Sequence, residues 1–148
     1  MGSSGHSSIE IPEEFAEASS DVLQLLMQAG YVACGCGVPS LAKVIFDGIA
    51  AVRPKSEQPL IGLALAYIHM GKLAAACDVL VNRATPISPG NQIIKAIAAM
   101  VFRISGEFAA SDRLLDDVIA DGTDPQAIEF ARQLKVEDFS YLRRKKFK

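Results

Sequence analysis

The chain has 148 residues, a formal net charge of -2 and a composition that is 50% hydrophobic. This length suits one domain with its own core. The balanced charge and the lack of tryptophan argue against a nucleic-acid-binding surface, which needs a basic face or stacking aromatic rings. Cys34, Cys36 and Cys77 form an odd set without zinc-binding spacing. We therefore expect reduced thiols and no metal site.

The small, polar residues 1–10 are predicted to be a flexible lead-in outside the fold. A single helical domain is expected over residues 11–136, followed by a basic C-terminal tail over residues 137–148. An acidic N-terminal helix is predicted over residues 11–20, either separate from the first repeat helix or continuous with it, because Pro12 followed by two glutamates is typical of a first helical turn.

Residues 22–42 carry no charged side chain and are long enough to span a bilayer. Gly35, Gly37 and Pro39 interrupt this stretch near its end. Because glycine and proline disfavour a continuous helix, the stretch predicts two short buried helices and no membrane insertion.

Three glycines mark the ends of apolar helical stretches at a nearly constant interval. Gly37 and Gly71 are 34 residues apart, and Gly71 and Gly106 are 35 apart. Such a period predicts an internal repeat in which a helix ends at the glycine and a second helix follows. The dipeptides Ser88-Pro89 and Asp124-Pro125 each predict an N-cap followed by proline at the first helical position.

At each fixed distance from these glycines, the residues of the three repeats are similar in size. Small residues follow after five positions and large apolar ones after nine, so two helices can approach closely and fill the groove between them. With the aromatic residues that lie four positions before the second and third glycines, these predicted packing residues are Ala42, Phe46, Tyr67, Ala76, Leu80, Phe102, Ser111 and Leu115.

The pattern resembles tetratricopeptide repeats (TPR) over residues 21–123. The residues that carry the likeness are Gly30, Ala42, Phe46 and Pro54 in one unit and Leu63, Tyr67, Gly71 and Ala76 in the next. The resemblance implies an all-α fold, in which three antiparallel helix pairs stack as a short right-handed solenoid. Residues 124–135 are expected to form a C-terminal capping helix. The alternative is a helical bundle without repeats.

No constellation in the sequence predicts catalysis. His69 has no second ligand or carboxylate at helical spacing, and Ser40-Leu41-Ala42-Lys43 matches an acyl-enzyme pattern without its companion motifs. Asp116, Asp117 and Asp121 lack the spacing of a calcium loop. We therefore expect a protein that is not an enzyme and that uses no cofactor.

In tetratricopeptide proteins, the first helix of each pair lines a concave surface. The resemblance therefore implies a mostly apolar partner-binding groove, which suits an amphipathic helix. Its expected residues are Met27, Tyr31, Cys34, Ile61, Leu65, Ile68, Ile93, Met100 and Arg103. Two alternatives are that these side chains are plain core and that the same face forms a homodimer.

A narrower resemblance is to bacterial type III secretion chaperones, including those of needle and translocator subunits and the Hrp-type proteins. Residues 65–76 (LAYIHMGKLAAA) look like their second repeat, and residues 124–128 (DPQAI) look like the closing helix of the Hrp-type members. This implies a cytoplasmic chaperone or adaptor that shields an apolar helix of a small secreted subunit or binds a co-chaperone. The alternative is a homo-oligomeric scaffold without an exchangeable client.

Overall fold

The structure is a computed structural model that describes residues 13–137, with side chains from Ser20 onward. The expected lead-in and nearly all of the expected basic tail lie outside the described residues. Within this range the chain is helical and has no strand. The helices are α1 (Glu13–Gly35), α2 (Pro39–Val52), α3 (Gln58–His69), α4 (Leu73–Asp78), η1 (Val79–Ala84), α5 (Thr85–Ile87), α6 (Gln92–Ile104), α7 (Phe108–Asp121) and α8 (Pro125–Val136).

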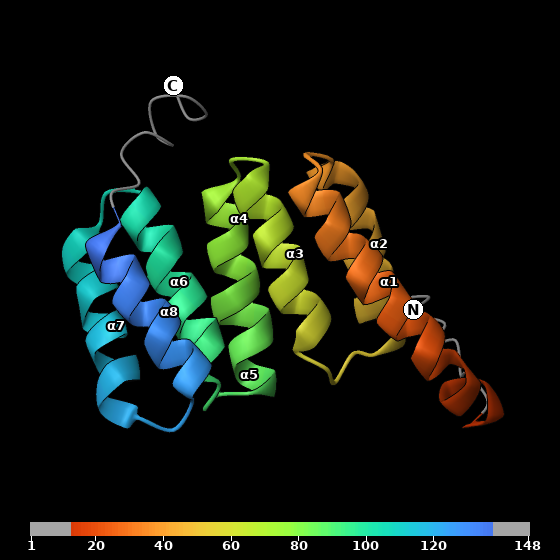
Figure 1. The fold of residues 1–148 in the computed structure, drawn as a ribbon. Coiled ribbons are helices and arrows are strands. Elements are labelled where there is room, and N and C mark those ends of the chain that lie inside the picture. The colour runs from red at the N-terminus through yellow and green to blue at the C-terminus, as the bar shows by residue number, and fades with distance from the viewer. Residues whose placement is uncertain (1–12, 138–148) are drawn as a thin grey trace, which may run out of the picture.

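The helices form three successive antiparallel pairs and a last helix (Figure 1). The pairs are α1 with α2, α3 with the continuous α4–η1–α5 helix, and α6 with α7, while α8 packs on α6 and α7. The predicted all-α stack of three helix pairs with a capping helix is confirmed.

The first helix of each pair ends in the same way. Gly37, Gly71 and Gly106 have φ angles of 79°, 74° and 87°, a conformation that glycine adopts without strain. The amide that follows each glycine donates a 2.8 Å hydrogen bond to the carbonyl oxygen five residues earlier, at Ala33, Tyr67 and Phe102 respectively. This bond closes a Schellman cap, so the regular glycine spacing is the spacing of three equivalent helix ends.

The core between the helix pairs is built from alternating large and small residues. Phe46 of α2 is fully buried, and its ring lies against Gly30 of α1 and Gly62 of α3. The small and large positions of the repeat, Ala42, Ala76, Ser111, Leu80 and Leu115, are also fully buried. The residues four positions before the turn glycines, Tyr67 and Phe102, are only partly buried.

The second helix of the middle pair is one residue longer than its counterparts. It runs from residue 73 to residue 87, whereas α2 and α7 have 14 residues each. Its segment η1 is π-helical, and the Thr85 hydroxyl donates a 2.7 Å hydrogen bond to the Leu80 carbonyl oxygen, five residues back. A π turn accommodates one extra residue, which accounts for the additional residue of this helix.

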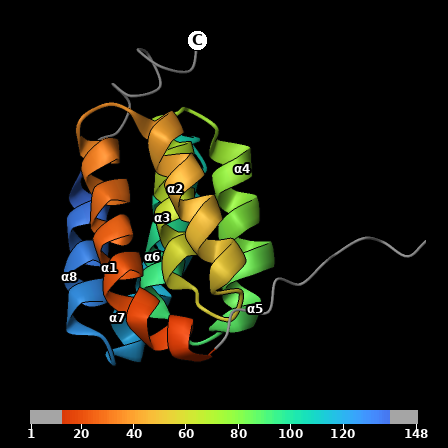
Figure 2. The same cartoon turned by 90° about the vertical axis from the view of Figure 1, so that its right-hand side faces the viewer.

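The first helix pair differs from the prediction of two short buried helices. The helix α1 has 23 residues, and the chain does break between Gly35 and Pro39 as expected. However, α1 and α2 stand at the open end of the stack (Figure 2), where Val22, Leu25 and Val32 are more than half exposed. No neighbouring pair covers this end, so an uncharged stretch is left partly in solvent. None of the described helices combines the length and hydropathy of a membrane span.

Candidate functional site

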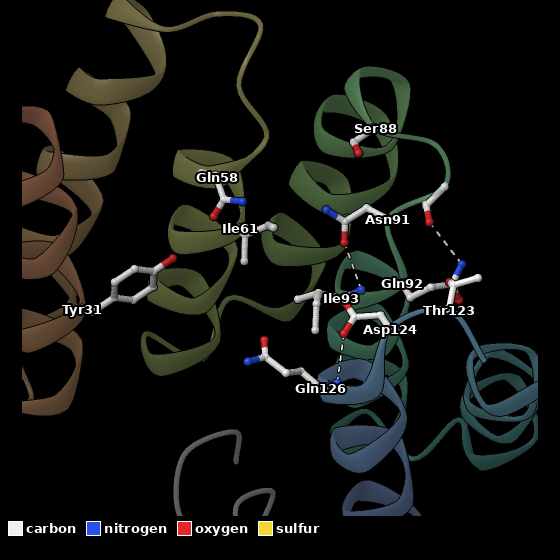
Figure 3. Close-up of a pocket in the computed structure, with 11 residues that line it drawn as sticks. Tyr31, Gln58, Ile61, Ser88, Asn91, Gln92, Ile93, Thr123, Asp124 and Gln126 are labelled. Carbon is white, nitrogen blue, oxygen red and sulfur yellow. Dashed lines mark hydrogen bonds between the residues drawn. The ribbon is translucent and has the colours of Figure 1, made fainter. Parts of the chain in front are cut away.

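A cavity of about 560 Å³ crosses the face formed by the first helices of the three pairs. In Figure 2, α1 and α8 lie at the left edge of the molecule, and α3 and α6 lie to their right, toward its middle. The lining residues come from α1, α3, the loop before α6, the start of α6 and the start of α8 (Figure 3), and they are Tyr31, Gln58, Ile61, Ser88, Gly90, Asn91, Gln92, Ile93, Thr123, Asp124 and Gln126.

Three of these residues are among those that the sequence assigns to a groove. Tyr31 of α1, Ile61 of α3 and Ile93 of α6 are predicted groove residues, and all three line the cavity. Each lies on the first helix of a different pair, as the repeat register predicts. They form an apolar band across the stack, of which Ile61 is buried and Tyr31 is 39% exposed.

Five other predicted groove residues do not line the cavity. Met27, Leu65, Ile68 and Met100 are partly buried and pack against the hydrophobic core, and Cys34 is itself a buried member of that core. These residues lie one or two helical turns from the cavity-lining positions of their own helices, and the alternative of plain core packing describes their contacts.

Arg103, the remaining predicted groove residue, joins three helices. Its guanidinium binds an Asp112 carboxylate oxygen of α7 at 2.9 Å and donates a 2.9 Å hydrogen bond to the carbonyl oxygen of Lys135 at the end of α8. The same group lies 5.5 Å from the ring centre of Phe108. Its side chain is only 11% exposed, so its contacts hold α8 on the third helix pair.

Two helix starts border the cavity, and their caps explain its polar side. The Asn91 side-chain oxygen accepts hydrogen bonds from the amides of Ile93 and Ile94, at 2.9 and 3.2 Å. The expected cap at Ser88-Pro89 is wrong, because α6 begins at Gln92 and the loop continues past the proline. The expected cap at Asp124 is confirmed, with hydrogen bonds from Gln126 and Ala127.

The lining is more polar than the mostly apolar groove expected from the sequence. Four carboxamide side chains line the cavity, from Gln58, Asn91, Gln92 and Gln126. Apart from Gln58, these residues belong to the loops and helix starts that precede α6 and α8. The concave face of the repeat pattern does not include those segments, so the register alone could not place them there.

Tyr31 connects the cavity to the core. Its ring meets the ring of Phe46 edge to face, with the centres 5.2 Å apart. Partial burial, with a smaller contribution from Cys34, raises the pKa of the Tyr31 hydroxyl above its usual range. The hydroxyl is therefore a neutral hydrogen-bonding group at physiological pH.

Outside the cavity, the candidate chemical groups of the sequence remain separate. His69 is exposed, and its Nδ1 lies 2.9 Å from the Leu65 carbonyl oxygen one turn earlier. Among residues 13–137, no three histidine, cysteine or acidic side chains gather as ligands of a metal ion would.

The fold is similar to that of known proteins, although the sequence alone finds none. No family model and no curated protein matches the chain. A structure of SycD, the type III secretion translocator chaperone of Yersinia enterocolitica, aligns over 82% of this chain and 91% of its own, with a TM-score of 0.69 and 19% identity. A second SycD structure, described as an alternative dimer, covers 89% of this chain and 99% of its own, with a TM-score of 0.68 and 19% identity. The expected resemblance is confirmed at the level of fold, and this chain has the TPR-like all-α fold of that chaperone.

Proposed function

We propose that this protein is a cytoplasmic chaperone or adaptor of a type III secretion system. In this role it shields an apolar helix of a small secreted subunit and catalyses no reaction. The observation that carries the proposal is the cavity that crosses the first helices of all three pairs. The fold that the chain shares with a translocator chaperone supports the same role.

The chemistry of the cavity suits one face of an amphipathic helix. Tyr31, Ile61 and Ile93 offer an apolar band for the client's apolar side chains. The carboxamides of Gln58 and Gln126 lie beside this band and offer both donors and acceptors to polar side chains at the edge of the client helix. Burial of about 800 Å² on each partner would give an ordinary specific complex.

The proposal is tested by capture of clients from the native host. The purified protein serves as bait, and the bound proteins are identified by mass spectrometry. The variant Tyr31→Glu/Gln126→Glu places two carboxylates in the cavity, at positions that are exposed enough to tolerate them. It should lose a small helical secretion subunit that the parent protein captures, because a charge would be buried against the client's apolar face.

A matched control carries the same two added charges elsewhere. Gln133→Glu/Val136→Glu changes exposed residues of α8 that do not line the cavity. This control should capture the client as the parent does. If circular dichroism shows that both variants are folded and they capture the client equally well, the client does not bind in the cavity.

A homodimer without an exchangeable client is the second candidate. It is favoured by the apolar side chains at the open end of the stack, where Leu25 of α1 and Val44 of α2 are 65% and 67% exposed. Side chains of this kind on an uncovered helix pair are typical of an association surface. Sedimentation of the parent and of Leu25→Lys/Val44→Lys tests it. A dimer that this variant dissociates supports the second candidate, and a monomeric parent protein excludes it.

A further inference from the structure

A second groove lies on the other side of α6, between that helix and the α4–η1 helix. It has a volume of about 600 Å³. Most of its lining is apolar, from Leu73, Ala74, Cys77, Val81, Val101 and Phe102. Val81 stays 48% exposed. We call this site the α4–α6 groove; it shares no residue with the cavity described above.

The edge of the α4–α6 groove is acidic. Asp78 of α4 and Glu107 at the start of α7 line it, and no described lining residue is cationic. Both carboxylates lie close enough to Cys77 to raise the pKa of its thiol, in addition to the larger effect of burial. An occupant that fits this site has apolar side chains next to several positive charges.

The chain itself contains a segment with this composition. Phe139, Tyr141 and Leu142 are followed directly by Arg143-Arg144-Lys145-Lys146. The apolar residues match the lining of the α4–α6 groove, and the basic run matches its two carboxylates. Within residues 138–148 one carboxylate side chain, Asp138, stands before the apolar residues.

The last described turn before this segment, at the end of α8, is bound to α6, one wall of the groove. Arg103 donates a hydrogen bond to the carbonyl oxygen of Lys135, and its neighbour Phe102 lines the groove. Figure 1 shows the end of α8, the end of α6 and the start of α4 at the same end of the stack. Phe139 to Leu142 follow Glu137 by two to five residues, a reach of roughly 7–18 Å when extended, which is comparable to the width of about 10–12 Å of the one helix, α6, that has to be passed.

We propose that residues 138–148 bind the α4–α6 groove of their own chain, with the apolar residues inside and the basic run against Asp78 and Glu107. This inference is independent of the proposed client and of its cavity. In this proposal, the basic run binds the two carboxylates of its own chain.

Disulfide trapping tests the contact directly. In the full chain, Cys36→Ser removes an exposed thiol, Cys34 stays because it is buried, and Ser140→Cys adds a thiol within the segment. Under mild oxidation, the disulfide between Cys77 and residue 140 should form at least about tenfold faster than in a control whose Phe139, Tyr141 and Leu142 are serines, because binding raises the effective concentration of the two thiols. Peptide mapping identifies the bond.

Charge reversal separates binding from mere tethering. Because these carboxylates raise the pKa of Cys77, each trapping rate is divided by the rate at which the same Cys77 reacts with a small disulfide reagent. On this scale, Asp78→Lys/Glu107→Lys should slow trapping to the rate of the serine control, and changing Arg143, Arg144, Lys145 and Lys146 to glutamate in that background should restore it. Asp117→Lys/Glu129→Lys alters exposed carboxylates outside the groove and should leave the rate unchanged. If neither charge reversal changes the rate of trapping, the proposal is wrong. Disulfides that join two chains overturn it as well, because the groove would then hold the segment of a second copy.

Discussion

Gly62 of α3 faces the ring of Phe46 of α2 so closely that a Cβ atom on Gly62 would overlap the ring. Gly30 of α1 meets the tip of the same ring, where a Cβ would lie 2.6 Å from its outermost carbon atom. The first two helix pairs therefore approach each other at one aromatic side chain that contacts a glycine of each pair.

This contact predicts a large difference between two glycine-to-alanine changes. Gly62→Ala should lower the free energy of unfolding by about 1–3 kcal/mol, because the buried ring has to move. Gly48→Ala should raise it by about 0.5–1 kcal/mol, since Gly48 lies in α2 and a methyl group added there would meet no atom within 4 Å. Urea unfolding measures both. A neutral Gly62→Ala would show that the ring has room to shift.

The cap of α6 gives a second pair of variants. Asn91→Ala should lower the free energy of unfolding by about 1 kcal/mol, because two amides at the helix start lose their acceptor. Ser88→Ala should change it by less than about 0.5 kcal/mol, as expected for a residue outside the cap. The same urea titrations suffice, and a larger loss in Ser88→Ala would reinstate the cap expected from the Ser-Pro pair.

The contacts of Arg103 predict that it matters more than an ordinary surface ion pair. Arg103→Met should lower the free energy of unfolding by about 1.5–3 kcal/mol, because charge-assisted bonds from α6 to α7 and α8 are lost together. Lys43→Met breaks a partly exposed pair with Asp47 one turn away and should cost clearly less. Equal losses from the two changes, measured in urea, would contradict a bracing role.

Alkaline pH should destabilise the fold through buried acidic protons. Burial raises the pKa of the Tyr31 hydroxyl and of the Cys34 thiol, so the folded chain holds these protons more tightly than the unfolded chain does. Their contribution to stability is present below the unfolded pKa values, which are about 8.5 for cysteine and 10 for tyrosine, and it is lost as the pH rises through the folded values. The free energy of unfolding should therefore fall above about pH 8.5.

The tyrosine part of this loss can be isolated. Tyr31→Phe keeps the aromatic ring against Phe46 and removes the ionisable group. Its stability should fall less steeply than that of the parent above about pH 10. Parallel curves for the two proteins would mean that Tyr31 does not contribute to the alkaline loss.

The repeat could be predicted because it rests on local rules. A left-handed backbone conformation at a helix end favours glycine, as at Gly37 and Gly71. A close approach of two helices favours a small residue, as at Ala42. The residue type at these positions therefore predicts the local structure. The repeat register also assigns Tyr31, Ile61 and Ile93 to the first helices of the three pairs, and all three line the cavity.

The cavity as a whole could not be predicted in this way. Gln92 and Gln126 reach it only because the loops before α6 and α8 bring two helix starts together, which depends on how the third pair packs. The exposed apolar residues of α1 were missed for a related reason. Uncharged composition predicts burial only where a neighbour is present to cover the residues, and the first pair has a neighbour on one side.

The π turn in η1 has a consequence for the rest of its own helix. In a regular α-helix, one inserted residue would rotate all later residues of that helix by about 100° around the axis. Here the extra residue is taken up within residues 79–84, and the packing residue Leu80 and the later Ala84 both remain buried. The end of the helix thus keeps its apolar side toward the core, where Ile87 of α5 still packs.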